Sequence, residues 1–416
     1  MRDIHPKTPV ASIKREFTSE QLKQGFDVDL VSALVGMSRS FINKVLGARV
    51  TCITLAQVLL LLDQDAFAET FVPRSRIPSF LLSAHERPKA GPLPERSFQL
   101  VQGNAVDLIA SLPPGSVQCV VTSTPYWGMR LYDHAYEHAW ADGETCALGS
   151  EQTPEGFIRH TVEFLFWLKP ALSKTGSVWW NLMDAYNTRT QIRGNAAETL
   201  RAMKGQDTKG WKDHACRRYS AGHSFLKDGE QCLIPGRVAS RLSRIGYYLK
   251  STIAWKKNGS LPETVESRVT REMEYILHLS IERTPYFDKQ AFLRHAPAVG
   301  GRNPRFEAEK ITDIWHFSTA SGLDGHGAQF PVALPGRCIA LSTKPGDLVL
   351  DPFVGSGTTN VAARLLGRRS IGFDISAKYL AIAKARVEKA RLHLVDRESE
   401  AEEKRTSIPA LQAKLL

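Results

Sequence analysis

The alternation of strand-like and helical segments between residues 97 and 390 constrains the fold of this 416-residue chain more than any other feature. The strand-like runs are 98–101, 117–122, 176–182, 247–255, 274–279, 348–350 and 369–373, and the helical stretches between them are 105–112, 155–172, 236–245, 331–340, 359–366 and 378–392. Strands and helices that alternate in this way predict a layered α/β sheet. We therefore expect one α/β domain over residues 97–395.

The first 70 residues predict a small, all-helical domain. An apolar stripe at helical spacing runs from Leu30 to Val35, Gly36-Met37-Ser38 interrupts it, and the short helix Arg39–Leu46 follows. Helix, glycine turn and short helix resemble the helix-turn-helix of repressor-type proteins. In that interpretation Arg39, Asn43 and Lys44 contact DNA. The alternative is a helical bundle used for packing or dimerisation.

Four further segments do not fit the strand–helix alternation. Prolines predict a linker over 71–96, and charge predicts a frayed tail over 396–416. Polar, basic insertions near 187–231 and 290–312 predict loops, and loops this long are usually functional or disordered. We expect DNA contacts from five basic side chains of the first insertion: Arg189, Arg193, Lys209, Arg217 and Arg218. The alternative is a solvated mobile insertion.

The composition narrows the class of protein. A formal net charge of +11 favours a polyanionic partner, because Lys and Arg displace counterions from phosphates. Six scattered cysteines with no Cys-x-x-Cys argue against zinc and disulfides, and for a reducing compartment. The N-terminus has no apolar signal segment, and no apolar run approaches the roughly 20 residues of a membrane span. We therefore expect a cytoplasmic protein, associated with the nucleoid in a prokaryote.

A glycine-rich turn, Asp351-Pro352-Phe353-Val354-Gly355-Ser356-Gly357-Thr358-Thr359, follows the strand-like run at 348–350. Glycines at 355 and 357 permit a sharp turn and close approach of the backbone to a ligand. The next strand ends at Asp374, whose carboxylate can accept both hydroxyls of a ribose. The turn is neither Gly-x-Gly-x-x-Gly nor a Gly-Lys-Ser/Thr phosphate loop. A nucleoside that carries a short charged group therefore fits it better than a pyrophosphate or triphosphate. The alternative is a purely structural turn.

A second polar segment, Ser123-Thr124-Pro125-Tyr126-Trp127, follows the strand-like run at 117–122. An exocyclic amino group of adenine or cytosine is a poor nucleophile, because its lone pair is delocalised into the ring. The Ser123 hydroxyl and the Thr124 carbonyl can localise that pair by accepting the amino protons, and Pro125 restricts the Thr124 backbone. Tyr126 offers a stacking face for a flipped base, and Trp127 a pocket wall. Methyl transfer from a sulfonium to such a base rests on positioning and needs no metal.

These two segments resemble the motifs of the amino-methylating DNA methyltransferases, [Asp/Asn/Ser]-Pro-Pro-[Tyr/Phe/Trp] and Asp-Pro-Phe-x-Gly-x-Gly-Thr-Thr. The substrate motif precedes the cofactor motif, which is the permuted order of the family's β group. The resemblance implies a Rossmann-like class I methyltransferase fold whose mixed sheet has a reversed last strand. It also implies S-adenosylmethionine as methyl donor, double-stranded DNA as substrate, a homodimer and no metal. Thr124 departs from the pattern, because the family usually has a first proline there.

The resemblance further implies which residues hold the donor. The segment Gln102–Asp107 resembles the strand–helix turn that faces the donor's adenine, with Asn104 where the family often has Asp. The segment His326–Pro331 resembles the one beside the donor's methionine part. The complete expected set is Asn104, Ala105, Thr122, His326, Phe330, Asp351, Pro352, Phe353, Gly355, Ser356, Gly357, Thr358, Thr359, Asp374 and Ile375.

The sequence thus predicts a site-specific DNA methyltransferase that acts on an exocyclic amino group. Adenine N6 is favoured only because it is the commoner product in this group, and Ser123 leaves cytosine N4 open. No Pro-Cys dipeptide is present, which argues against methylation of cytosine C5. The sequence is also compatible with a helix-turn-helix regulator that has a degenerate methyltransferase body, and with a methyltransferase that acts on RNA.

Overall fold

The computed structural model describes ten stretches of the chain: 15–64, 70–84, 97–129, 137–191, 206, 217–219, 223–258, 263, 265–318 and 330–390. Three predicted site residues, Arg193, Lys209 and His326, and the predicted tail 396–416 lie outside the described residues. Within the described stretches, the structure has no helix that is long and apolar enough to cross a membrane.

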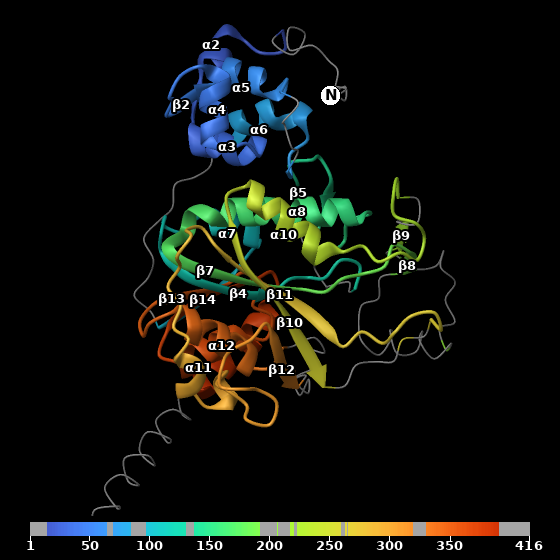
Figure 1. The fold of residues 1–416 in the computed structure, drawn as a ribbon, viewed down its shortest axis with the longest axis vertical. Coiled ribbons are helices and arrows are strands. Elements are labelled where there is room, and N and C mark those ends of the chain that lie inside the picture. The colour runs from blue at the N-terminus through green and yellow to red at the C-terminus, as the bar shows by residue number, and fades with distance from the viewer. Residues whose placement is uncertain are drawn as a thin grey trace, which may run out of the picture.

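A sheet of eight strands forms the centre of the molecule (Figure 1). Its strands are, in spatial order, β12 (Ile314–Ser318), β10 (Tyr248–Asn258), β11 (Met273–Ser280), β7 (Leu172–Leu182), β4 (Val117–Ser123), β13 (Leu348–Asp351), β14 (Arg369–Asp374) and β3 (Phe98–Gln102). All neighbouring pairs are parallel except those of β11, which is antiparallel to both β10 and β7. The predicted mixed α/β sheet is confirmed. The reversed strand, however, is neither last in the chain nor at the edge of the sheet, and β12 was not predicted.

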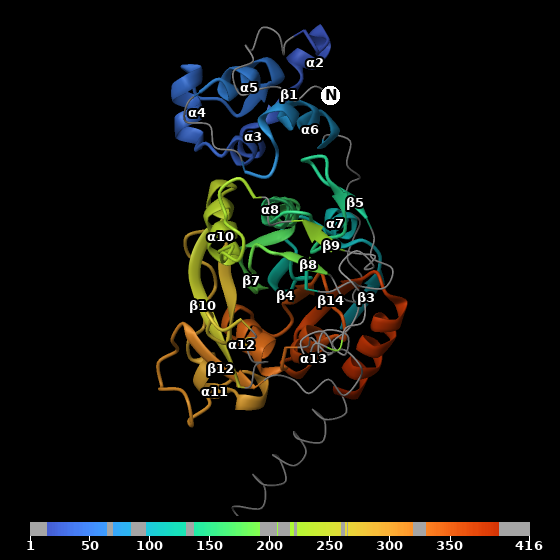
Figure 2. The same cartoon turned by 90° about the vertical axis from the view of Figure 1, so that its right-hand side faces the viewer.

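Helices cover both faces of the sheet (Figure 2). On one face lie α7 (Ala105–Ala110), α8 (Pro154–Leu168) and α10 (Ile234–Arg244); on the other lie α11 (Ala291–Arg294), α12 (Ala333–Ser342), α13 (Thr358–Leu365) and a helix over 377–390. Side chains of β7 alternate between the two cores, with Val178 and Trp180 facing α8 and Trp179 facing α12. The helix predicted to reach residue 172 ends at Leu168, because Pro170 has no N–H to donate to the Phe166 carbonyl, and a short 3-10 helix over Lys169–Ala171 follows.

A helical unit precedes the sheet and consists of α2 (Ser19–Lys23), α3 (Val28–Val35), α4 (Arg39–Leu46) and α5 (Leu55–Leu62). The unit is not all-helical as predicted, because β1 (Gly25–Asp27), after α2, pairs with β2 (Cys52–Thr54), before α5, in a small antiparallel sheet. Gly36 ends α3, and the Ser38 hydroxyl caps α4 by accepting from the backbone N–H of Phe41 at 3.2 Å. The predicted helix, glycine turn and short helix are confirmed as local structure, while DNA binding by this unit stays a prediction.

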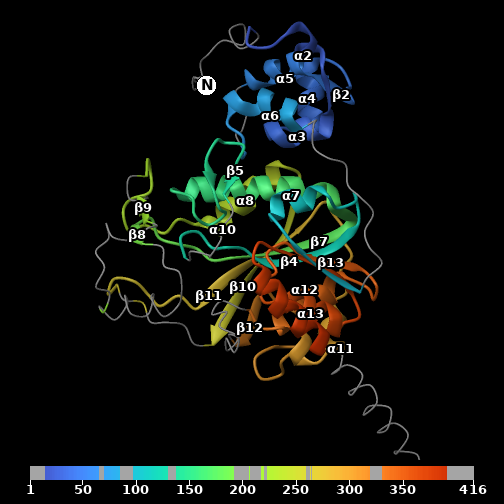
Figure 3. The same cartoon turned by 180° about the vertical axis from the view of Figure 1, so that it is seen from behind.

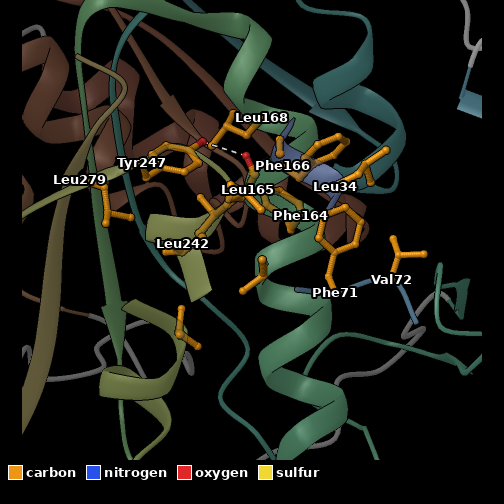
Figure 4. Packing of buried hydrophobic residues seen from close by; sticks show 14 of the residues in the cluster. Leu34, Phe71, Val72, Phe164, Leu165, Phe166, Leu168, Leu242, Tyr247 and Leu279 are labelled. Atoms are coloured by element: carbon orange, nitrogen blue, oxygen red, sulfur yellow. Dashed lines mark hydrogen bonds between the residues drawn. The ribbon is translucent and has the colours of Figure 1, made fainter. Parts of the chain in front are cut away.

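The segment predicted as a proline-rich linker contains regular structure. The short helix η1 (Arg74–Arg76) leads into α6 (Ile77–Ala84), which includes Pro78. Proline is tolerated in the first turn of a helix, where its missing N–H has no partner to lose. Phe71, which is fully buried, packs against Phe166 of α8 with ring centroids 4.9 Å apart (Figure 4). The helical unit is therefore seated on α8, as Figure 3 shows from behind.

Both predicted insertions contain more structure than their composition suggested. In the first, β8 (Arg189–Gln191) pairs with β9 (Arg217–Tyr219) in a two-stranded sheet. The second contains α11 and is bound to α12 by Arg337, which is 1% exposed. The Arg337 guanidinium donates to the carbonyls of Gly300 and Gly301 at 2.8 and 3.0 Å and to the Glu307 carboxylate. The expected loop at 290–312 is thus held against α12 of the α/β domain by a buried charge.

Candidate active site

The two predicted segments lie side by side at one edge of the sheet. Strands β4 and β13 are parallel neighbours, with Cys119 paired to Val349 and Val120 to Leu350. Their carboxyl ends therefore meet at the same edge, where open α/β sheets bind ligands. Thr122, the residue before Ser123, donates from Oγ1 to Oδ1 of Asp351 at 2.7 Å and so joins the ends of the two strands. This direct contact places the ends of the two segments side by side.

Asp374 holds the glycine-rich turn in place. Its Oδ2 accepts from the backbone N–H of Gly355 at 3.0 Å and its Oδ1 from that of Ser376 at 2.8 Å. Gly355 and Gly357 have φ values of 49° and 82°, in the left-handed region that favours glycine. Burial raises the pKa of Asp374 above its usual range. Its two oxygens keep further acceptor capacity, so the expected ribose contact is compatible with this geometry.

Asp351 is the most buried carboxylate of the cofactor segment, at 2% exposure. Burial raises its pKa to about 6. Hydrogen bonds from Thr122, from Thr359 and from the backbone of Phe353 act in the opposite direction and lower the pKa. A carboxylate enclosed in this way attracts a cationic ligand group, because low polarity strengthens the pairing. The neighbouring Pro352 is also buried, and Phe353 packs against Phe164 of α8.

The hydroxyls of the glycine-rich turn face inward and do not cap the next helix. The cap position of α13 is Gly357, and no side chain caps that helix. The Arg386 guanidinium donates to Ser356 Oγ at 2.6 Å and to Thr358 Oγ1 at 3.3 Å. Thr359 Oγ1 donates to the Val121 carbonyl at 3.3 Å. These side chains hold the turn from behind.

The end of β3 closes this part of the site. Asn104 caps α7 by accepting from the backbone N–H of Val106, and the N–H of Gly103 donates to the Asp374 carbonyl at 3.0 Å. Ala105 is buried behind this turn, and Ile375 follows Asp374 directly and is half-buried. Phe330, 8% exposed, is part of the core on the α12 side of the sheet.

Around Ser123 the structure brings together polar side chains from four strands. Ser123 Oγ donates to the Tyr126 hydroxyl at 2.9 Å, and that hydroxyl donates to Oε2 of Glu274 on β11. Asn181 of β7 donates from Nδ2 to the Tyr126 hydroxyl and to Glu274 Oε2, both at 2.7 Å. Lys257 of β10 donates to Glu274 Oε1 at 3.0 Å. Sequence reasoning missed Asn181, Lys257 and Glu274. The only signal was that Asn181 and Glu274 are polar residues next to apolar strand runs.

The rest of the substrate segment is enclosed. Thr124 is 4% exposed, and its Oγ1 is buried with no hydrogen-bond partner among the described residues. Trp127 is 1% exposed and donates from its indole nitrogen to the Glu151 carbonyl at 2.9 Å. Because its ring is buried in the core, Trp127 supports the loop from below. The role of pocket wall expected for this residue stays a prediction.

A charged cluster lies beneath this loop. His160 is fully buried between Glu151 (Nδ1 to Oε1, 3.0 Å) and Asp142 (Nε2 to Oδ1, 3.2 Å). Burial lowers its pKa, but the hydrogen bonds outweigh that effect and raise the pKa to about 11. Ligand atoms of Glu144, Cys146 and His160 lie within 4.8 Å of one another, a spacing that could suit a metal. Both ring nitrogens of His160 are engaged by carboxylates, so we interpret the cluster as a support for the loop.

The predicted DNA contacts differ in their surroundings. Arg39 and Lys44 are exposed on α4, and Arg39 lies 3.3 Å from Asp29. Asn43 is half-buried and accepts from the backbone N–H of Val50 at 3.1 Å, so its side chain is engaged within the helical unit. Arg189 is exposed on β8, and the backbones of Arg217 and Arg218 pair with this strand in β9.

Comparison with known proteins assigns the family. Residues 117–385, more than half of the chain, match the family model described as DNA methylase, of the N6/N4 class. The type II methyltransferase M.Cfr9I of Citrobacter freundii is 32% identical over 312 residues, which cover 74% of this chain and 93% of that protein. M.SmaI of Serratia marcescens is 30% identical over 296 residues, 71% of this chain and 92% of that protein.

Among solved structures, the PvuII DNA methyltransferase, described as cytosine-N4-specific, aligns over 72% of this chain and 95% of its own, with 18% identity and a TM-score of 0.49. The assignment rests on the family model and the sequence relatives. The chain belongs to the N6/N4 DNA methylase family and is a DNA methyltransferase of the kind that uses S-adenosylmethionine as methyl donor.

Proposed function

We propose that this enzyme methylates the exocyclic amino group of a base flipped out of double-stranded DNA, at the edge of the sheet where β4 and β13 end. One observation carries this proposal: Thr122 contacts Asp351 of the donor segment while the adjacent Ser123 contacts Tyr126 of the base segment. Thr122 and Ser123 are consecutive residues of β4, so the donor segment and the base segment meet at adjacent positions of one strand. Positioning of two reactants at such a distance is the main requirement of methyl transfer.

In this proposal the donor lies over the glycine-rich turn. Asp351 faces its cationic methionine part and Asp374 its ribose. Asn104, Ala105 and Ile375 lie near its adenine, and Phe330 and His326 on the methionine side. When bound, the donor supplies an electrophilic methyl group. The chain's own residues orient the base: Ser123 Oγ and the Thr124 carbonyl accept the amino protons, Pro125 restricts Thr124, and the Tyr126 ring stacks on the base.

Adenine N6 is the target that we propose first, because methylation of adenine N6 is the commoner reaction in the family. Cytosine N4 is the second candidate, because in the family a serine at the position of Ser123 goes with cytosine N4 or with adenine. The test is incorporation of labelled methyl into mixed-sequence DNA, followed by hydrolysis to nucleosides. The methylated nucleoside that is found, N6-methyladenine or N4-methylcytosine, identifies the target base. No incorporation into DNA, or incorporation into RNA alone, would contradict the proposal.

We propose further that the helical unit contacts DNA through Arg39 and Lys44 of α4, and that the β8–β9 insertion reads the recognition sequence. Reversal of charge in Arg39→Glu/Lys44→Glu should weaken DNA binding and flatten its salt dependence, because each lost phosphate contact lowers the slope by about one. A double variant at the exposed Glu20 and Asp63, changed to Gln and Asn, is the control. The family resemblance also predicts a homodimer, which sedimentation analysis tests directly.

A further inference from the structure

A chain of hydrogen bonds leads from the proposed base site to a buried carboxylate. It starts at Ser123 Oγ, passes through the Tyr126 hydroxyl and ends at Glu274 Oε2. Ser123 and Tyr126 belong to the predicted substrate segment, whereas Glu274 comes from β11, 148 residues beyond Tyr126. Nothing in the methyl-donor part of the site requires a carboxylate at that place.

The chemistry of the side chains determines the direction of every bond. A carboxylate can only accept, so the Tyr126 hydroxyl donates its proton to Glu274. An amide nitrogen can only donate, so Asn181 Nδ2 occupies one lone pair of the Tyr126 oxygen. Ser123 must then donate to Tyr126, since the tyrosine proton is already committed. The lone pairs of Ser123 Oγ are therefore available to an incoming amino proton.

Both oxygens of the Glu274 carboxylate accept hydrogen bonds. Its side chain is 10% exposed, and Lys257 Nζ contacts Oε1 at 3.0 Å, while Oε2 accepts from Tyr126 and Asn181. A buried carboxylate with a cation on one oxygen and donors on the other is stable as the anion. The oxygen that faces Tyr126 can nevertheless take a proton, and Lys257 then remains as a cation beside a neutral acid.

We infer that Glu274 is the final acceptor of the proton that the amino group releases during methylation. The inference rests on the proposed base-binding role of Ser123. The amino nitrogen forms the new N–C bond with its lone pair, the S–C bond of the donor breaks, and its electron pair stays on sulfur. The nitrogen, now positively charged, releases one proton to Ser123 Oγ. The Ser123 proton moves to Tyr126, and the Tyr126 proton to Glu274, which ends as the neutral acid.

Two variants interrupt this relay with little change in shape. Glu274→Gln keeps the size of the side chain but replaces one accepting oxygen by a donating amide and cannot take up a proton, and Tyr126→Phe keeps the stacking ring but breaks the chain. Removal of a general base typically costs 10²–10⁴-fold in rate, so we expect a loss of roughly 100-fold or more in single-turnover methylation for each variant. The double variant should be no slower than the slower single variant, since both remove the same pathway.

The control is Glu272→Gln, which removes the same charge two residues away at an exposed position 4.0 Å from Lys256; it should methylate at the wild-type rate. Donor affinity by calorimetry, DNA affinity and base flipping reported by 2-aminopurine fluorescence should stay near wild type in all variants. A Glu274→Gln rate within about threefold of wild type, or a loss confined to KM or affinity, overturns the inference. Failure of the wild-type protein to methylate DNA would instead refute the proposed function.

Discussion

At the scale of single residues, the site depends on side chains that are buried and whose polar atoms have few partners. Asp351 and Thr124 are 2% and 4% exposed, yet one carries a charge and the other a hydroxyl that has no partner in the described part of the chain. Burial of a charge or an unpaired polar group costs free energy, which the folded chain must recover elsewhere or when a ligand binds. Both residues can therefore be tested individually.

Donor binding should depend on pH through Asp351. Burial raises the pKa of this carboxyl to about 6, so it is mostly protonated at pH 5 and mostly ionised at pH 7. The donor's methionine part is cationic and favours the ionised form. We expect its affinity, measured by calorimetry, to fall about tenfold from pH 7 to pH 5, in proportion to the ionised fraction. Asp351→Asn should bind the donor weakly at both pH values, and an equal pH dependence in this variant would contradict the assignment.

Replacement of the Thr124 side chain distinguishes the role of its hydroxyl from the role of its backbone carbonyl. Thr124→Val keeps the branched shape and the carbonyl but removes the buried Oγ1, which has no partner among the described residues. We expect the free energy of unfolding to rise by about 1 kcal/mol, and methylation to continue at the wild-type rate. Ser123→Ala is the contrasting variant and should slow methylation. A large loss of rate in Thr124→Val would mean that the hydroxyl itself contacts the base.

At the scale of elements, the glycine-rich turn is held between the end of β14 and the helix over 377–390. Asp374 holds one end through the N–H of Gly355, and Arg386 holds the other through Ser356 and Thr358. Gly357 lies so close to that helix that a Cβ would come within 2.7 Å of the Cβ of Ala383. The turn therefore has a single position, defined by the two elements on either side.

A matched pair of glycine variants tests this packing. Gly357 and Gly367 both have positive φ, 82° and 69°, but a Cβ at Gly367 would meet nothing within 4 Å. Gly367→Ala should lower the free energy of unfolding by about 1 kcal/mol, from backbone strain alone, and leave donor affinity unchanged. Gly357→Ala should destabilise more and weaken donor binding at least tenfold, as measured by calorimetry. Equal donor affinities in the two variants would show that the turn tolerates displacement.

At the scale of the whole molecule, the helical unit and the sheet share one hydrophobic core. Phe71 and Leu34 belong to the same buried cluster as Phe164 and Phe166 of α8 (Figure 4). Arg241 of α10 reinforces this contact by donating to the Thr70 carbonyl at 2.8 Å. A shared core couples the stability of its parts, so we expect the helical unit and the sheet to unfold together.

We therefore expect the wild-type protein to unfold in one calorimetric transition. Phe71→Ala removes a fully buried ring between the two parts and should lower the free energy of unfolding by about 3–5 kcal/mol, or split the transition in two. Leu60→Ala, at a position on α5 that is 46% exposed, should cost less than 1 kcal/mol. Two transitions in the wild-type protein would show that the parts unfold independently.

Much of this architecture was predictable from local sequence. Alternation of strands and helices predicted seven of the strands in the large sheet and their connecting helices. The two motifs identified Ser123, Asp351 and Asp374, which the structure gathers at one edge. These features depend on residues close together in the chain, where periodicity and turn chemistry act directly. Helix α6 was not predicted from the sequence, because a high density of prolines indicates irregular structure. Pro78, however, lies in the first turn of α6, where proline is tolerated.

By itself, the sequence determined the kind of fold, the family, and the two segments that carry the chemistry. Only the tertiary structure decided that Glu274 ends the hydrogen-bond chain from Ser123, that Trp127 lies in the core, and that Phe71 joins the helical unit to α8. The physical reason is that these contacts join residues far apart in the chain. Crossover connections make β7 and β11 neighbours, and no local pattern specifies which side chains then meet.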